Sequence, residues 1–146
     1  MFWQQSRVKV RDITDGTSNT VMMSEVIIRI HPSNARVYGE PGSYWLGGYW
    51  GEVGFTALEV PNTSVADSIF GTETGTLGCK EDNNPFAPCV AGRTSASHRS
   101  YARSYHTGGV NALMADGSVR FVSSNIHRPT WRGLSTRGGN EIIGEF

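Results

Sequence analysis

The sequence lacks a long hydrophobic run. No apolar stretch approaches the roughly 20 residues that a transmembrane helix needs. The first ten residues, MFWQQSRVKV, also lack the apolar centre of a signal peptide. We therefore expect no membrane segment and no export signal in this chain. An exported parent protein would fit this expectation if Met1 were an internal start within a longer chain.

The motifs of several common enzyme classes are also missing. The sequence contains no GxSxG elbow, no HExxH motif, no P-loop and no GxGxxG fingerprint. These absences argue against a serine hydrolase of the usual α/β type, a standard zinc protease, an NTPase and a dinucleotide-binding enzyme.

Neither sign of charge predominates, since 13 basic residues balance 13 acidic ones. This balance argues against a general nucleic-acid binder, so no nucleic-acid partner is expected. Residues 1–89 hold 6 basic and 10 acidic side chains, a difference of −4, and residues 90–146 hold 7 and 3, a difference of +4. We expect these halves to fold onto each other or to pack between subunits. The alternative is a basic face around Arg93, His98, Arg99 and Arg103.

Cysteine is scarce, with only Cys79 and Cys89, and the segment between them is rich in turn-forming residues. A disulfide closing this loop would stabilise the fold by about 2 to 3 kcal/mol. It would also imply an extracytoplasmic, secreted or cell-surface location for the parent protein. Two free thiols in a reducing compartment are the alternative, and the spacing disfavours a zinc site.

The composition favours short strands joined by turns. The 146 residues suit one domain, residues 1–146, and 18 of them are glycine. Residues 20–30 are rich in β-branched side chains after the turn-forming run DITDGTSNT, which predicts a strand. Residues 61–100 read as long loops with a helical turn at residues 64–70. The predicted fold class is mainly β (α+β), with an antiparallel sheet, long loops and one short C-terminal helix.

A β-hairpin is predicted at residues 110–122, where Asp116-Gly117 separates two alternating runs. These two residues suit a two-residue type I′ turn, which would pair Met114 with Val119 and Ala112 with Phe121. The predicted apolar face holds Val110, Ala112, Met114, Val119 and Phe121. The opposite face holds Asn111, Leu113, Ala115, Ser118 and Arg120.

The C-terminal segment predicts a short helix that begins near Pro129 and ends at Gly138-Gly139. Trp131 and Leu134 would then lie on one face and pack against the sheet.

Residues 39–55 alternate aromatic side chains with glycines. The pattern favours packing in the core or at a subunit contact. A carbohydrate-stacking platform built from Trp45, Tyr49 and Trp50 is the functional alternative.

Three ordered segments resemble a known family. They are DITDGTSNTVMMSE, which ends at Glu25, then YHTGGVNALMADGSVRFVSSNI, and TWRGLSTRGGNEII. In the second, nine residues separate His106 from Asp116-Gly117. The chain resembles the soluble C-terminal domain of the planctomycete-type prepilin-like, pseudopilin-related family named for its H-X9-DG motif. The resemblance implies a pilin-like fold and other pilin-like subunits as partners. The family's N-terminal helix is missing, and Thr107 replaces a common proline.

The first segment offers oxygen ligands for a metal ion, on Asp12, Asp15, Thr17, Asn19 and Glu25. Calcium prefers six to eight such ligands, and the resemblance to the major pseudopilins also implies a loop-bound Ca²⁺. The alternative is that Asp15 and Asn19 cap turns through local hydrogen bonds.

The leading functional prediction is a structural or interaction domain that holds calcium. The alternative is a small metal-dependent hydrolase, using Ca²⁺ or less favourably Zn²⁺, that acts on esters or lactones such as acyl-homoserine lactones. His106 and Asp116 would be its catalytic residues, with His31, His98 and His127 as other candidate imidazoles. A turn role for Asp116 and a buried hydrogen-bonding role for His106 are the structural alternative to catalysis.

Overall fold

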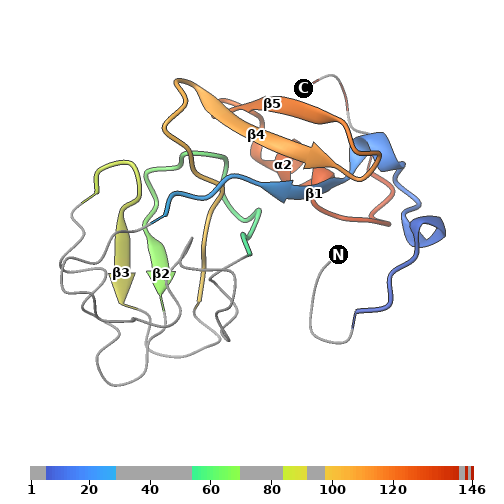
Figure 1. Ribbon diagram of the computed structural model, residues 1–146, viewed down its shortest axis with the longest axis horizontal. Helices are drawn as coiled ribbons and strands as arrows, with labels where there is room; N and C mark the ends of the chain where they lie inside the picture. The colour runs from blue at the N-terminus through green and yellow to red at the C-terminus, as the bar shows by residue number, and fades with distance from the viewer. Residues whose placement is uncertain (1–5, 29–53, 70–83, 92–97, 142–143, 145) are drawn as a thin grey trace.

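The computed structural model describes residues 6–28, 54–69, 84–91, 98–141, 144 and 146. Its main sheet is antiparallel and has the order β1-β4-β5, with β1 at Val21–Ser24, β4 at Gly109–Met114 and β5 at Val119–Ser123. The helix α2, Arg128–Leu134, lies behind this sheet in Figure 1. A second sheet pairs β2, Asp67–Ile69, with β3, Cys89–Ala91. The predicted fold class is confirmed.

The hydrophobic core lies between the main sheet and α2. Its buried members come from β1, β4, β5, the helix and the segment before β4: Val21, Ala102, Val110, Ala112, Met114, Val122, Trp131 and Leu134. The ring of Phe55 stacks on that of Trp131, with 5.9 Å between centroids. The predicted helix and its apolar face are therefore confirmed, although the helix ends at Leu134, earlier than predicted.

The hairpin is present, but its predicted turn and register are wrong. Leu113 pairs with Val119 and Asn111 with Phe121, one residue away from the predicted pairs. The N–H of Gly117 donates to the carbonyl of Met114 (3.0 Å), so Ala115 and Asp116 are the central residues of the turn. In this turn region only Gly117 has positive φ, at 87°. This is the longer type of hairpin loop, in which a glycine follows a type I turn.

The shifted register changes which side chains of β5 are buried. Val122 is buried, whereas Val119 and Phe121 are exposed, contrary to the prediction. Val110, Ala112 and Met114 are buried as predicted.

Two other predictions for strands and turns need correction. β1 ends at Ser24, so the strand predicted for residues 20–30 is shorter, and residues 29–30 lie outside the described part of the chain. The helical turn predicted for residues 64–70 is wrong because Asp67–Ile69 forms β2, which pairs with β3 in parallel. Its pairing partner lies far along the chain, so no local turn signal could indicate it.

The two oppositely charged halves of the sequence do contact each other. Glu59 lies 3.2 Å from Arg128, and Asp67 lies 3.1 Å from Arg103. The alternative basic face is wrong for Arg103, because its side chain is 2% exposed and paired. Arg93 lies outside the described residues.

Several predictions concern residues that the structure does not describe. Trp45, Tyr49, Trp50 and His31 are among them. Cys89 opens β3 and is not a free thiol, but Cys79 lies outside the described residues, so the Cys79–Cys89 bond stays a prediction. Within the part of the chain that is described, no helix has the length and apolar character needed to cross a membrane.

Candidate functional site

Glu25 follows β1 and joins the first motif segment to the second. Its carboxylate accepts hydrogen bonds from the backbone N–H of Asn111 (2.8 Å) and from the side-chain amide of Asn111 (3.1 Å). His106 Nε2 lies 3.2 Å from Glu25 Oε1. The His106 side chain is 55% exposed, so the prediction that it is a buried partner is wrong. Its role as a hydrogen-bond partner is confirmed.

The surroundings of Glu25 favour its ionised form. Burial raises the pKa of the Glu25 carboxyl, but the two hydrogen bonds from Asn111 and the contact with His106 outweigh that effect. The pKa is therefore lowered from its ordinary value of 4.5. The carboxylate thus holds β4 against the end of β1 as a charged acceptor.

The first and second segments also join at the other end of β4. The N–H of Asp116 donates to the carbonyl of Thr17 (3.1 Å), and the N–H of Ala115 donates to that of Thr20 (2.8 Å). The Asp116 carboxylate accepts hydrogen bonds from the hydroxyl and N–H of Ser118, at 2.6 and 2.9 Å. These two bonds lower the pKa of the Asp116 carboxyl, and the bond from the hydroxyl has the larger effect. The predicted turn role of Asp116 is confirmed.

The H-X9-DG spacing therefore corresponds to the length of one strand. His106 precedes β4 and Asp116 follows it, so the two residues predicted as catalytic lie at opposite ends of a six-residue strand. Each end contacts the first segment, through Glu25 at one end and Thr17 at the other. The motif residues are brought together with the first segment and not with each other.

Asp15 joins the first segment to the third. Its carboxylate accepts hydrogen bonds from the N–H groups of Gly139 (2.9 Å) and Asn140 (2.8 Å) and from the hydroxyl of Thr136 (2.9 Å). Loss of solvation raises the pKa of Asp15, but these three bonds outweigh it and hold the pKa below its ordinary value of 3.8. The carboxylate anchors the loop after α2.

The five predicted metal ligands are spread along this network. Asp12 accepts the N–H of Lys9 (2.8 Å), and the side-chain amide of Asn19 donates to the carbonyl of Asp15 (3.4 Å). Asp15, Thr17 and Asn19 lie before β1, whereas Glu25 lies after it, so the strand separates them. In the described ranges, no three His, Cys, Asp or Glu side chains form a group that could hold a metal ion.

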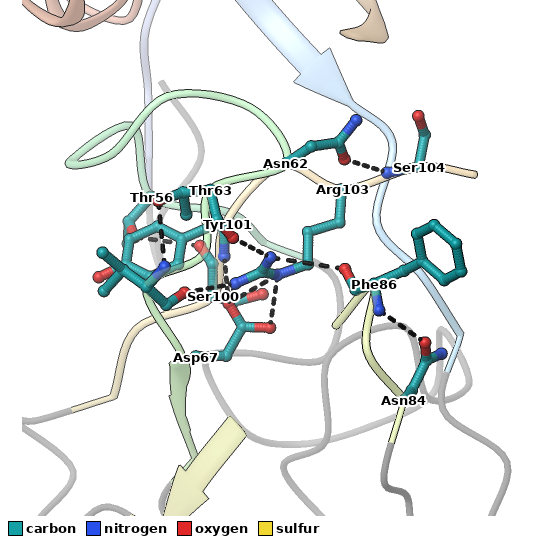
Figure 2. Close-up of polar contacts among 11 residues, drawn as sticks. Thr56, Asn62, Thr63, Asp67, Asn84, Phe86, Ser100, Tyr101, Arg103 and Ser104 are labelled. Carbon is teal, nitrogen blue, oxygen red and sulfur yellow. Dashed lines mark hydrogen bonds and ion pairs between the residues drawn. The ribbon is translucent and has the colours of Figure 1, made fainter. Parts of the chain in front are cut away.

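A buried ion pair between Asp67 and Arg103 was not predicted from the sequence. Arg103 Nε lies 3.2 and 3.1 Å from the two carboxylate oxygens of Asp67, and Nη2 lies 3.1 Å from Oδ1. Figure 2 shows the guanidinium pointing at this carboxylate. It also donates to the carbonyls of Thr63 (2.7 Å), Val65 (2.6 Å) and Phe86 (3.5 Å). One arginine thus ties together three chain segments.

A groove of about 400 Å³ lies beside this ion pair. Residues 62–64, 85–86 and 104–108 line it together with Ser124, and His106 is at its wall. The rings of Phe86 and Tyr105 meet edge to face, 5.4 Å apart. The sequence did not predict this pair of exposed aromatic residues either, because Phe86 and Tyr105 are far apart in the sequence and no local pattern connects them.

Comparison with protein-family models gives one match, which covers residues 1–128 and is described as a protein of unknown function, DUF1559. The chain belongs to the DUF1559 family. The match confirms the predicted H-X9-DG family, and it includes the whole of the first two motif segments. Neither the curated proteins nor the solved structures give a match.

The DUF1559 match ends at Arg128, where α2 begins. The third segment, with Trp131 in the core and the partners of Asp15, therefore follows the matched region. In this DUF1559 protein all three segments meet around the main sheet.

Proposed function

We propose that the chain is a pilin-like structural or interaction domain that packs against other pilin-like subunits outside the cytoplasm. One observation carries this proposal: the polar groups of the three motif segments bond to one another. The Glu25 carboxylate contacts His106 and accepts a hydrogen bond from Asn111. The carbonyl of Thr17 accepts one from Asp116, and the Asp15 carboxylate accepts one from the loop after α2. Residues used in this way hold the domain together and need no substrate.

The outer face of the main sheet supports the role of a packing surface. Met23 lies opposite Leu113, which lies opposite Val119, so the three form a row across β1, β4 and β5. Met23 is 52%, Val119 65% and nearby Phe121 51% exposed. We define Met23, Leu113, Val119 and Phe121 as the outer row. Contiguous exposed apolar side chains of this kind mark interaction surfaces.

Self-association tests the packing role, with a second copy of this chain as the available pilin-like subunit. The purified chain should form dimers or larger species in sedimentation equilibrium as its concentration rises. Val119→Glu should weaken this association by about tenfold or more. Val10→Glu, at a residue that is 72% exposed outside the row, should not. A monomer at all concentrations, or equal effects of the two variants, would contradict the proposal that this face packs against subunits.

The calcium part of the proposal centres on Asp15. Asp15 Oδ2 and Glu141 Oε2 lie 2.9 and 3.1 Å from the same hydroxyl, that of Thr136. Carboxylate and hydroxyl oxygens are the hard ligands that Ca²⁺ prefers. Glu25 lies beyond β1 and would take no part in such a site.

Chelation distinguishes the structural role from the alternative hydrolase. The chain is treated with EGTA and then resupplied with Ca²⁺ or Zn²⁺, while melting temperature and hydrolysis of a small ester and lactone panel are followed together. The proposal expects calcium to raise the melting temperature, less so in Asp15→Asn than in Asp12→Asn, with hydrolysis at background. Metal-dependent turnover that His106→Ala abolishes without unfolding the chain would instead establish the hydrolase. A melting temperature that does not change on chelation or on resupply of Ca²⁺ would contradict the calcium part of the proposal. It would not affect the packing role.

A further inference from the structure

The groove beside the Asp67–Arg103 ion pair has a chemistry that the proposed packing role does not use. Its walls come from three segments that are distant in sequence, at residues 62–64, 85–86 and 104–108, and from Ser124. Its volume of about 400 Å³ falls within the range of small-ligand sites.

The walls of the groove are held by one buried group. Arg103 donates to the carbonyls of Thr63 and Phe86, and Tyr105 follows it two residues later. Asn62 adds a further tie, because its side-chain oxygen accepts the N–H of Ser104 at 2.8 Å (Figure 2). Walls fixed by a buried network lose little conformational freedom when a ligand binds, which favours affinity.

Two aromatic rings stand exposed at the groove. Phe86 is 57% and Tyr105 64% exposed, although both side chains could bury large apolar areas. Asn84 holds the Tyr105 ring, since its amide donates to the Tyr105 hydroxyl (2.9 Å), and its side-chain oxygen accepts the backbone N–H of Phe86 (3.0 Å). The Phe86 ring in turn meets the Tyr105 ring edge to face. The rings are therefore positioned rather than left loose, and they offer an apolar surface to a ligand.

Apart from Pro85 and Gly108, the remaining lining residues are polar. The lining residues include no Asp, Glu, Lys or Arg, and His106 is their one imidazole. The hydroxyls of Ser64, Thr107 and Ser124 line the groove and bond to no other residue in the described part of the chain. They remain available to donate to and accept from a ligand that carries many hydroxyls.

We propose that this groove binds a neutral saccharide. A sugar ring has an apolar face of C–H groups and a rim of hydroxyls, so it matches exposed aromatic rings beside free hydroxyls. The absence of Asp, Glu, Lys and Arg from the lining disfavours acidic glycans and charged peptides, because such a ligand would lose hydration without meeting a permanent opposite charge. This inference does not depend on the packing role or on calcium.

The test is calorimetric titration of the full chain with cellotetraose, maltotetraose, mannotetraose and chitotetraose, with tetragalacturonate as the acidic probe. We expect at least one neutral tetrasaccharide to bind and tetragalacturonate not to bind. Phe86→Ala and Tyr105→Ala should each weaken binding by about tenfold, the effect of losing one stacking contact. Ile28→Ala is the control, since this apolar residue is 68% exposed and lies outside both the groove and the outer row.

Amide chemical shifts of the unmodified chain locate the bound sugar without relying on variants. Shift changes confined to residues 62–64, 85–86 and 104–108 and to Ser124 would support the groove. Absence of binding by all four neutral sugars, tighter binding of tetragalacturonate, or shift changes elsewhere would overturn the proposal. None of these outcomes would affect self-association of the outer row, so the two proposals can fail separately.

Discussion

His106 Nε2 lies 3.2 Å from Glu25 Oε1, and this contact joins the start of the H-X9-DG motif to the end of the first motif segment. The same carboxylate accepts two hydrogen bonds from Asn111 in β4. Glu25 therefore has more partners than an ordinary surface carboxylate, and these partners favour its charged form.

The lowered pKa of Glu25 predicts a pH dependence of stability. A carboxyl whose pKa is lower in the folded state stabilises the fold above its unfolded value, and this contribution is lost as pH falls through the folded value. The free energy of unfolding of the unmodified chain should therefore fall as pH drops below about 4.5. Glu25→Gln should be less stable than the unmodified chain at about pH 7, with the difference shrinking as the pH falls below about 4.5.

Urea denaturation at a series of pH values measures this difference directly. Comparison of the two proteins is needed because Asp15 and Asp116 also have lowered pKa values and contribute with the same sign. A difference between the two proteins that stays constant across the series would show that the charge of Glu25 is not what stabilises the fold.

The buried ion pair predicts a much larger effect. In Asp67→Asn the guanidinium of Arg103 would remain buried without its counter-charge, which should cost about 3 to 5 kcal/mol of unfolding free energy. Glu59→Gln removes the carboxylate that Arg128 and Arg132 share at the surface and should cost about 1 kcal/mol or less. Chemical denaturation measures the free energy of unfolding of both variants. Equal losses in the two would contradict the central role of Arg103.

Local sequence patterns predicted those parts of the fold that depend on neighbouring residues. Pro129, with Trp131 and Leu134 three residues apart, was enough to place α2, and Asp116-Gly117 was enough to place the hairpin. The register of the hairpin was missed by one residue because both a two-residue turn and the longer loop can accommodate Asp-Gly. Only the position of Gly117 at positive φ distinguishes them.

Contacts between distant segments could not be predicted in the same way. β2 pairs with β3 across the region that reads as loops, and Asp67 meets Arg103 across 36 positions. The opposite excess charge of the two halves indicated that such pairs exist. It did not indicate which residues form them. The residues of the first motif segment were identified as polar ligands, but their actual partners lie in β4 and after α2.

Gly117 predicts a cost for adding a side chain at the hairpin turn. Its φ of 87° is a conformation that other residues adopt with strain, while a Cβ there would meet no atom within 4 Å. Gly117→Ala should therefore lower the free energy of unfolding by about 1 to 2 kcal/mol through backbone strain alone. Gly117→Asn should cost less, because asparagine tolerates this region better. Thermal melts of both variants check the order, and equal stability of the alanine variant would contradict the observed turn.

Trp131 makes the strongest prediction about the core. Its side chain is fully buried against the sheet and stacks on Phe55, yet its indole N–H has no hydrogen-bond partner among the described residues. Trp131→Ala should cost about 3 to 5 kcal/mol because it leaves a large cavity.

Trp131→Phe should cost clearly less than the alanine variant. It keeps an aromatic ring against Phe55 and removes a buried donor whose lack of a partner costs about 1 to 3 kcal/mol. That relief offsets part of the lost packing, so the phenylalanine variant should stay folded at room temperature. Denaturation followed by far-ultraviolet circular dichroism measures both variants without relying on tryptophan fluorescence. If the phenylalanine variant proves as unstable as the alanine variant, the indole N–H contributes a hydrogen bond, and α2 is held to the sheet by more than apolar packing.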